Sequence, residues 1–214
     1  MSLDIKSVYQ VLREQHGKQE WWPGDSAFEI MIGAILTQNT AWTNVEKALA
    51  NLKQAGVLSL PGILDIAQDS LAKLIRPSGY YNQKAERLQG FCAWLSEQGG
   101  INSLQQRDTL DLRKDLLAIH GIGPETADDI LLYALDRPVF IVDAYTRRLF
   151  SRLDLIAGQE KYDELRLQFE KRLNGDVNLY NEYHALIVIH AKDVCRKTPL
   201  CDQCNLATHC RFCG

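Results

Sequence analysis

Residues 116–150 read LLAIHGIGPETADDILLYALDRPVFIVDAYTRRLF, and this stretch decides the fold. Apolar residues recur at helical spacing on both sides of a Gly121-Ile122-Gly123 turn, which predicts one helix over 111–120 and another over 124–135. Pro124 suits the first position of the second helix, where a missing N–H has no consequence. Two glycines allow the backbone N–H groups of the turn to point outward together, and such a group binds a phosphate oxygen.

The rest of the chain has the same helical periodicity, and we find no convincing run of alternating strand residues. The segment 138–142 is expected to be extended, and Asp143 to cap a helix over 144–152. Ser26 with Glu29, and Thr43 with Glu46, have the spacing of capping boxes. Further helices are expected over 27–38, 44–55, 65–75, 83–97, 161–173 and 178–194. The sequence therefore predicts an all-α protein.

Composition excludes several classes of protein. The chain has 214 residues, of which 46% are apolar and 24% charged, so it is neither a disordered tail nor a membrane protein. No apolar run approaches the length of a membrane-spanning helix, and the opening segment 1–20 lacks the features of a signal peptide, so we expect a cytoplasmic protein. A net charge of -3 excludes a globally basic nucleic-acid binder, so any DNA contact must come from local segments.

Five of the six cysteines lie within the C-terminal segment 195–214, whereas Cys92 stands alone. This density is typical of metal ligands, because a reducing compartment disfavours a disulfide framework. Four thiolates suit either an iron-sulfur cluster or a tetrahedral zinc ion. The five crowded cysteines are Cys195, Cys201, Cys204, Cys210 and Cys213.

The glycine turn, the aspartate that follows it at position 143 and the downstream cysteines together resemble the endonuclease III, or helix-hairpin-helix-GPD, superfamily of DNA glycosylases. The interval from Gly123 to this aspartate matches the family spacing between hairpin glycine and catalytic acid. The resemblance implies two helical domains that flank a DNA-binding cleft. A six-helix barrel would span 25–134 and include the hairpin near 111–135, and the second domain would combine 1–24 with 135–214. Such a cleft needs no partner subunit, so we expect a monomer bound to double-stranded DNA that contains damaged bases. The resemblance therefore implies a nucleoid-associated protein within the cytoplasm.

The resemblance implies that Asp143 is the catalytic carboxylate, which stabilises positive charge on the sugar as the base departs. An ordinary N-cap aspartate would explain the same residue, and the two roles can coexist. Bifunctional members carry a nucleophilic lysine two residues after the second hairpin glycine, and this chain has Glu125 there. A carboxylate cannot form an imine, so we expect no AP-lyase activity.

The cysteines resemble the C-terminal 4Fe-4S loop of the same superfamily, over 195–210. The resemblance implies Cys195, Cys201, Cys204 and Cys210 as ligands of a 4Fe-4S cluster, with zinc as the competing interpretation. The first gap, between Cys195 and Cys201, is one residue shorter than is usual in the family, and Cys213 is available as a spare thiol.

Two further segments resemble the 3-methyladenine DNA glycosylase subgroup: WWPGDSAFEIMIGAILTQNTAWTNVEKAL, from Trp21, and RPSGYYNQKAERL, residues 76–88. Aromatic faces attract a flipped cationic base more than a neutral one. The implied base pocket comprises Trp21, Trp22, Pro23, Trp42 and Lys192. The tryptophans would equally serve as buried hydrophobic contacts. Lys192 fits such a pocket only if it is buried and neutral or covalently modified, for instance carbamylated; its alternative role is a favourable contact with the helix dipole.

The resemblance implies that Gln38 fills the gap left by the flipped base, with Asn39 beside it. A polar helix end is the alternative for both. The DNA backbone would be held by Gly121 and Gly123, with help from Thr126, and by Arg147 and Arg148. Arg152 extends this basic stripe, and Arg76, Lys84 and Arg87 could form a second one; solvation or ion pairing would equally explain each arginine.

These features predict a monofunctional DNA N-glycosylase of base excision repair that removes alkylated purines such as 3-methyladenine. Three alternatives stay open from the sequence. The first is a uracil or thymine-mismatch glycosylase of the same superfamily, against which the tryptophan-rich front end argues. The second is a non-catalytic hairpin protein that binds damaged DNA. The third is a zinc or iron-sulfur interaction protein without DNA affinity.

Overall fold

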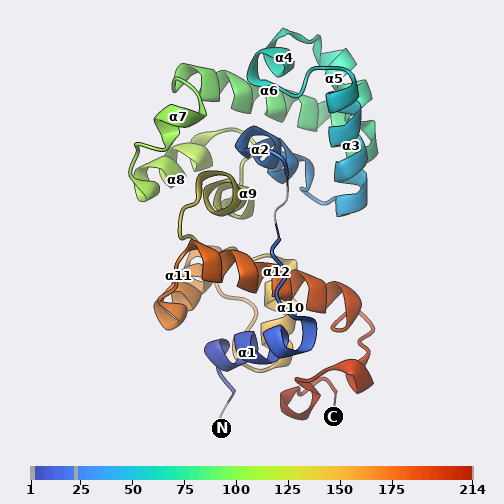
Figure 1. The fold of residues 1–214 in the computed structure, drawn as a ribbon, viewed down its shortest axis with the longest axis vertical. Coiled ribbons are helices and arrows are strands. Elements are labelled where there is room, and N and C mark those ends of the chain that lie inside the picture. The colour runs from blue at the N-terminus through green and yellow to red at the C-terminus, as the bar shows by residue number, and fades with distance from the viewer. Residues whose placement is uncertain (1–2, 22–23, 214) are drawn as a thin grey trace. The chain divides into compact units, whose positions relative to one another are not determined.

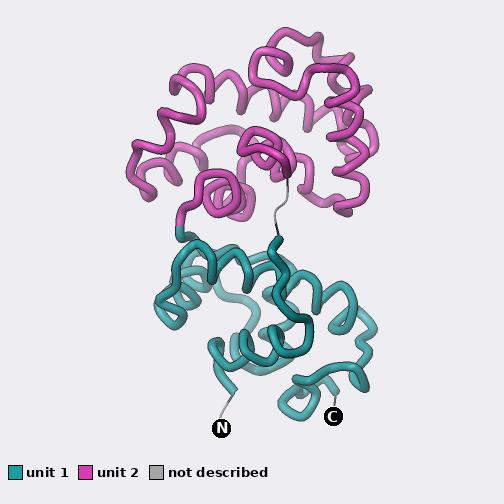
Figure 2. Tube along the Cα trace, viewed as in Figure 1, with its two compact units in different colours: residues 1–21, 138–214 teal, residues 22–137 magenta. Residues whose placement is uncertain are grey.

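The computed structural model describes residues 3–21 and 24–213, and its regular structure in these ranges is helical, without a strand (Figure 1). This confirms the all-α fold class. The chain divides into two compact units: unit 1 comprises residues 1–21 and 138–214, and unit 2 comprises residues 22–137 (Figure 2). The expected domain limits of 25 and 134 fall slightly inside those of unit 2. Within the described ranges, no helix combines the length and apolar character that crossing a membrane requires.

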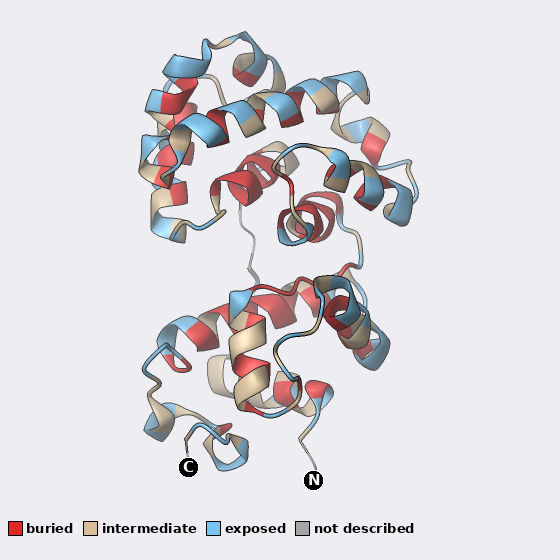
Figure 3. Ribbon diagram, turned by 180° about the vertical axis from the view of Figure 1, so that it is seen from behind, coloured by how far each residue is buried: buried red, intermediate tan, exposed pale blue. Residues whose placement is uncertain are grey.

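Unit 2 is built around one buried helix, α2 (Ala27–Leu36), in which every residue from Glu29 to Leu36 is buried. Ser26 caps α2 by accepting a hydrogen bond from the Glu29 backbone N–H. The other elements are α3 (Trp42–Gln54), α4 (Leu60–Asp65), α5 (Gln68–Leu74), η1 (Arg76–Ser78), α6 (Tyr81–Glu97), α7 (Ile101–Leu104), α8 (Thr109–Ala118), α9 (Pro124–Asp129) and the π-helical turn η2 (Ile130–Ala134). Helix α2 contacts α3, α6, α9 and η2 of the same unit. Figure 3 colours the buried residues of these elements red.

Unit 1 joins the two ends of the chain around an aromatic core. The ring of Phe169 stacks on Phe140, with centroids 4.6 Å apart, and meets the edge of Phe150 at 4.7 Å. The buried Tyr183 hydroxyl donates to the Ile5 carbonyl at 2.6 Å, which ties the first helix to the last one. The elements are α1 (Ile5–His16), α10 (Ala144–Arg152), α11 (Tyr162–Leu173), α12 (Val177–Asp193), η3 (Cys201–Gln203) and η4 (Ala207–His209).

Two local expectations are wrong. The capping box at Thr43 and Glu46 does not form, because α3 begins at Trp42 and its N-cap residue Ala41 offers no side-chain acceptor. The second hairpin helix is not a regular α-helix over 124–135, because it widens into η2 after Asp129. Helices α1, α4 and α7 have no counterpart among the expected elements.

Candidate active site and nucleic-acid interface

The helical hairpin of residues 109–129, which comprises α8, the glycine turn and α9, is held together by a buried ion pair. Arg113 of α8 donates to both carboxylate oxygens of Asp128 in α9, at 2.6 and 3.1 Å. Both side chains are buried, so the pair fixes how the two helices meet. The turn between them closes with a hydrogen bond from the Ile122 N–H to the Ile119 carbonyl, at 3.1 Å.

The two glycine positions of the hairpin differ in how strongly their backbone conformation and surroundings require glycine. Gly121 has a φ of +82°, and a Cβ there would lie 2.5 Å from Nε of Arg87. Gly123, the N-cap residue of α9, has a φ of −92°, and a Cβ there would meet no atom within 4 Å. The turn therefore requires glycine at 121 for both backbone conformation and space, whereas position 123 has room for a side chain.

Gln38 joins the α2–α3 loop to the hairpin. Its Nε2 donates to the Gly121 carbonyl and to Oγ1 of Thr126, each at 3.0 Å. Its Oε1 accepts from Nη1 of Arg87 at 2.6 Å. Thr126 is buried, so it supports the loop from inside, which corrects its expected place among residues exposed to DNA.

Lys84 and Arg87 do not form the expected exposed basic stripe. Lys84 is buried, and its Nζ donates to the Leu36 carbonyl, the Ser78 carbonyl and Oγ1 of Thr40, at 2.6 to 2.8 Å. Burial lowers the pKa of Lys84 to about 8, and the nearby Arg87 charge acts in the same direction. Both side chains are used to hold the loops of unit 2.

Asp143 lies at the start of α10 in unit 1, buried and with its two oxygens in different surroundings. Oδ1 accepts from the N–H and the hydroxyl of Thr146, at 2.7 and 2.8 Å. Oδ2 lies 3.6 Å from Nε2 of His184 on α12. Burial raises the pKa of Asp143, but the neighbouring charge of His184 and the Thr146 hydrogen bonds leave that pKa below its ordinary value. The carboxylate is thus kept ionised in a buried site.

Two of the arginines on α10 support the C-terminal loop. Arg148 donates to the Cys195 and Ala191 carbonyls, at 2.9 and 2.7 Å. Arg152 donates to Sγ of Cys195 at 3.2 Å and to the Arg196 carbonyl at 2.8 Å. Arg147, by contrast, makes a 3.4 Å contact to the Gly158 carbonyl. Arg147 is therefore a better candidate for phosphate contact than Arg148.

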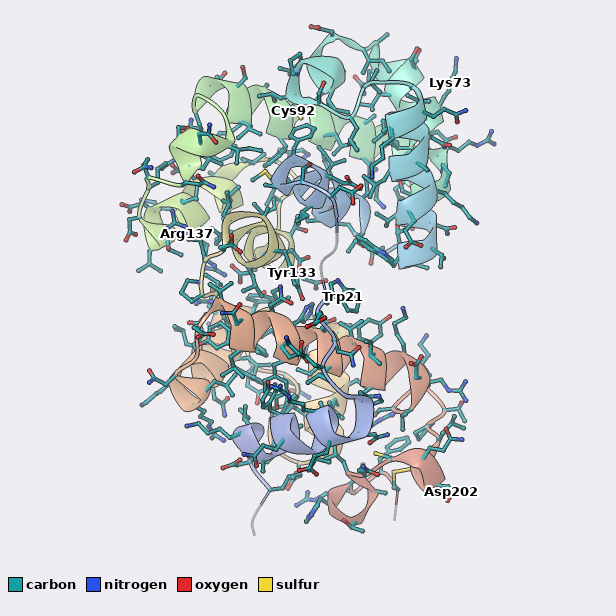
Figure 4. All side chains as sticks on the ribbon, in the orientation of Figure 1. Trp21, Lys73, Cys92, Tyr133, Arg137 and Asp202 are labelled. Carbon is teal, nitrogen blue, oxygen red and sulfur yellow. A yellow bond between two sulfur atoms is a disulfide. The ribbon has the colours of Figure 1, made fainter. Side chains whose placement is uncertain are left out.

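The residues expected to form a base pocket have varied surroundings. Trp21, labelled in Figure 4, is half-buried, and Trp22 and Pro23 lie outside the described residues. The ring of Trp42 lies over α2, where a Cβ at Gly33 would be 3.5 Å from it. Lys192 is exposed in the last turn of α12, which contradicts the expectation of a buried, modified lysine there. Glu125 is exposed in the first turn of α9.

The five C-terminal cysteines line one small pocket in unit 1, together with Arg152 and apolar side chains. Cys201 and Cys213 are joined in a disulfide, drawn beside Asp202 in Figure 4, and Cys195, Cys204 and Cys210 are free thiols. Within the described ranges, no group of three histidine, cysteine or acidic side chains is arranged to hold a metal ion. The expected set of four thiols is not assembled, because the spare Cys213 reaches Cys201.

Three residues of these sites were not foreseen in their observed roles: His184 beside Asp143, and Lys84 and Arg87 beneath the hairpin. His184 carries no spacing signal, because its contact crosses from α12 to α10. The exposed Tyr80, at a φ of +44° between η1 and α6, was also not foreseen. Tyr80 lies within the RPSGYYNQKAERL segment, so the resemblance of that segment to the glycosylase subgroup is the signal that could have drawn attention to this residue.

Known proteins resemble both the sequence and the fold. Residues 32–174 match the family described as HhH-GPD superfamily base excision DNA repair protein. MJ1434 of Methanocaldococcus jannaschii, provisionally named a DNA repair glycosylase, is 50% identical over 209 residues, covering 96% of this chain and 95% of that protein. Endonuclease III of Thermotoga maritima is 30% identical over 187 residues, covering 86% and 83%.

Among solved structures, the H. pylori 3-methyladenine DNA glycosylase MagIII, bound to 1,N6-ethenoadenine, has a TM-score of 0.79 at 35% identity. The match covers 89% of this chain and 98% of that one. A non-covalent endonuclease III–DNA complex has a TM-score of 0.82 at 20% identity, covers 97% and 94%, and supports the fold alone. These matches confirm the resemblance noted from the hairpin, the spaced aspartate and the tryptophan-rich segment. The chain belongs to the HhH-GPD superfamily of base excision DNA repair glycosylases.

Proposed function

We propose that this protein is a monofunctional DNA glycosylase that flips alkylated purines such as 3-methyladenine out of duplex DNA and hydrolyses their N-glycosidic bond. The observation that carries the proposal is the buried Asp143 carboxylate. Its Oδ1 is occupied by Thr146, which leaves Oδ2 as the oxygen for chemistry. The similarity to MagIII favours alkylated purines as the substrate class.

The chemistry follows from the charge of the lesion. An N3-alkylated adenine is cationic and leaves as a neutral base, so the positive charge passes to the sugar as the bond breaks. An ionised carboxylate beside the anomeric carbon stabilises that charge. Water then adds to the sugar carbon and gives up one proton, which Asp143 is able to accept. No protonation of the departing base is needed.

The DNA would be held by the backbone amides of Gly121 and Gly123 and by Arg147. Trp21, Trp22, Pro23 and Trp42 are the proposed pocket residues, because aromatic faces favour a cationic base. Lys192 is not part of this proposal. Glu125 stands where a lyase would need its lysine, so the reaction would end at the abasic site. We propose a monomer.

The C-terminal loop has the donor chemistry for a 4Fe-4S cluster, because its cysteines line one small pocket beside the cationic Arg152. Reduction of the Cys201–Cys213 disulfide would free the fourth thiol. Cys195, Cys201, Cys204 and Cys210 would then hold the cluster, which would serve as a structural link within the loop. Iron and acid-labile sulfide in the protein purified without oxygen would support this, and zinc alone would contradict it.

The test of the proposed function is base release from duplex DNA that contains 3-methyladenine, with wild type beside Asp143→Asn. Release by wild type that falls by about 10²-fold or more in the variant, with DNA affinity retained, is expected from loss of a group that stabilises developing charge. A uracil-containing duplex is the control substrate. Release of uracil but not of 3-methyladenine would reject the proposed substrate class, and a borohydride-trapped covalent adduct would reject the monofunctional reaction.

A further inference from the structure

Two histidines of unit 1 connect the last turn of α1 to the cysteine loop. His190, in the last turn of α12, is fully buried. Its Nδ1 lies 3.0 Å from Nε2 of His16 in α1, and its own Nε2 lies 3.6 Å from Sγ of Cys204. The three residues thus form one chain of hydrogen-bonding contacts, which runs from the half-buried ring of His16 to a sulfur atom. The proposed function uses neither histidine.

The backbone around Cys204 is fixed by the same end of α1. Nε2 of Gln15 donates to the Gln203 carbonyl at 2.7 Å, and Oε1 of Gln15 accepts from the Asn205 N–H at 3.0 Å. One side chain therefore binds both the residue before Cys204 and the residue after it. This clamp places the Cys204 sulfur next to the His190 ring.

His190 also binds the start of the cysteine loop. Its carbonyl accepts hydrogen bonds from the N–H groups of Val194 and Cys195, at 2.9 and 2.7 Å. Cys195 and Cys204 both line the small pocket of the loop. The backbone of one buried residue therefore holds the first of the proposed cluster ligands, and its ring contacts another.

The state of the Cys204 sulfur determines which ring nitrogen of His190 carries a proton. Cys204 is a free thiol here, but a metal ligand is a deprotonated thiolate, whose sulfur only accepts hydrogen bonds. A hydrogen bond from His190 to that sulfur therefore requires the N–H at Nε2. Full burial favours the neutral ring, which has a single N–H. Nδ1 is then an acceptor, and Nε2–H of His16 is its donor.

We propose that His190 is a positioning residue for the metal-binding sulfur of Cys204, to which its Nε2–H donates, and that His16 fixes the tautomer that makes this donation possible. Hydrogen bonds to ligand sulfurs help to set the reduction potential of an iron-sulfur cluster. Such a bond withdraws electron density from the sulfur, so it favours the reduced cluster and raises the potential. Residues that orient metal ligands in this way also contribute to metal affinity. The inference rests on the proposed 4Fe-4S cluster, and it is independent of which base the enzyme removes.

The experiment uses the whole protein, purified without oxygen and with its cluster. Two quantities are measured: the midpoint potential of the cluster, by a redox titration followed by electron paramagnetic resonance, and the rate of iron release to a chelator, followed by absorbance. His190→Leu removes the donor and keeps a buried apolar side chain. His190→Gln keeps an amide N–H near the position of Nε2. His209→Leu, at an exposed position of the same loop, is the matched control.

We expect His190→Leu to move the midpoint potential to a more negative value and to release iron about tenfold faster than wild type. His190→Gln should restore most of both properties, because the donor is regained. His16→Leu should cause a smaller shift of the potential in the same direction, because Nδ1 of His190 loses the donor that fixes the tautomer. His209→Leu should behave like wild type.

Three results would overturn the inference. The first is a midpoint potential that stays at the wild-type value in His190→Leu. The second is equal shifts in His190→Leu and His190→Gln, which would make His190 a packing residue whose N–H has no role. The third is a wild type that contains zinc or no metal in place of iron and sulfide, which would reject the proposed cluster and the inference with it.

If His190→Leu does not fold, His16→Leu decides the question, because it changes a half-buried ring at the end of the chain of contacts. A cluster potential that is unchanged in His16→Leu would then contradict the assigned tautomer and the donation to sulfur that depends on it.

Discussion

The two oxygens of Asp143 have different partners, and this difference separates a local role from a chemical one. Oδ1 caps α10 through Thr146, as an N-cap aspartate commonly does. Oδ2 faces His184 across to α12. One residue therefore starts a helix and keeps a charged oxygen in a fixed orientation, and neither role excludes the other.

His184 should set the acid limit of base release. Removing His184 takes away a neighbouring charge that lowers the pKa of Asp143, so that pKa rises. Activity needs the ionised carboxylate and falls as pH drops through its pKa. In His184→Leu we therefore expect the acid limb of the pH–rate profile to move to higher pH.

The control for this prediction is His184→Gln, whose amide is able to keep a donor near Oδ2 without the charge. We expect an intermediate shift for this variant. If the acid limb stays in place in both variants while the maximal rate falls, His184 contributes packing alone and the assigned electrostatic role is wrong.

Lys84 gives a second pH-dependent prediction, which concerns the free energy of unfolding. Its pKa is about 8 in the folded protein against 10.5 for an ordinary lysine, so the unfolded chain binds more protons between these values. Stability from this site therefore rises with pH from about 8 to 10.5. We expect wild type to gain roughly 1–3 kcal/mol over Lys84→Met across that window, in addition to any difference at neutral pH.

Urea denaturation of both proteins at several pH values measures this difference. Lys73→Met, at an exposed position on α5 that is labelled in Figure 4, is the matched control and should show no such trend. A stability difference between wild type and Lys84→Met that is independent of pH would contradict a buried lysine with a lowered pKa.

At the scale of elements, the hairpin turn predicts unequal effects at its two glycines. Gly121→Ala would strain a positive φ and push a Cβ into Arg87, whereas Gly123→Ala meets open space at a negative φ. We expect Gly121→Ala to destabilise the protein by about 2 kcal/mol or more, and Gly123→Ala by less than about 1 kcal/mol. Thermal unfolding followed by circular dichroism measures both, and equal effects would contradict the packing of Arg87 on the turn.

Sequence patterns predicted a helix correctly where the residues that favour a helix start agree with the apolar periodicity that follows them. Pro124 begins α9, Ser26 caps α2 and Asp143 caps α10, each as expected from local chemistry. The π-helical turn after Asp129 was not predictable, because its residues are as apolar and as periodic as those of an α-helix. The capping box predicted at Thr43 was wrong because the spacing to Glu46 satisfied a local rule, whereas α3 already begins at Trp42.

The candidate site was predictable only where a motif carried it. Spacing from the hairpin pointed to Asp143, and residue type pointed to the cysteines. The partners of these residues come from contacts between distant positions, such as Gln38 with Gly121 or His184 with Asp143, which no local pattern encodes. The exposure of Lys192 and the burial of Lys84 likewise depend on which face of each helix packs.

At the scale of the whole molecule, unit 2 is continuous in sequence, whereas unit 1 needs both ends of the chain. The buried face of α1 consists of Ile5, Val8 and Leu12, all fully buried, and α1 packs on α11 and α12. Burying each such side chain contributes about 2 kcal/mol, so α1 contributes roughly 6 kcal/mol to unit 1. That amount is comparable with the entire stability of a typical domain.

We therefore expect a fragment of residues 22–137 to fold alone into a helical, cooperatively melting domain, and a fragment of residues 138–214 to remain largely unfolded. Circular dichroism and urea titration of the two fragments test this. Addition of a peptide of residues 3–21 should restore helicity to the second fragment, because Ile5 then returns its carbonyl to Tyr183 and its side chain to the core. A peptide with Ile5, Val8 and Leu12 changed to serine should restore none. A stable fold in 138–214 without the peptide would show that the aromatic core around Phe169 is sufficient, and that α1 is an addition to unit 1 rather than part of its core.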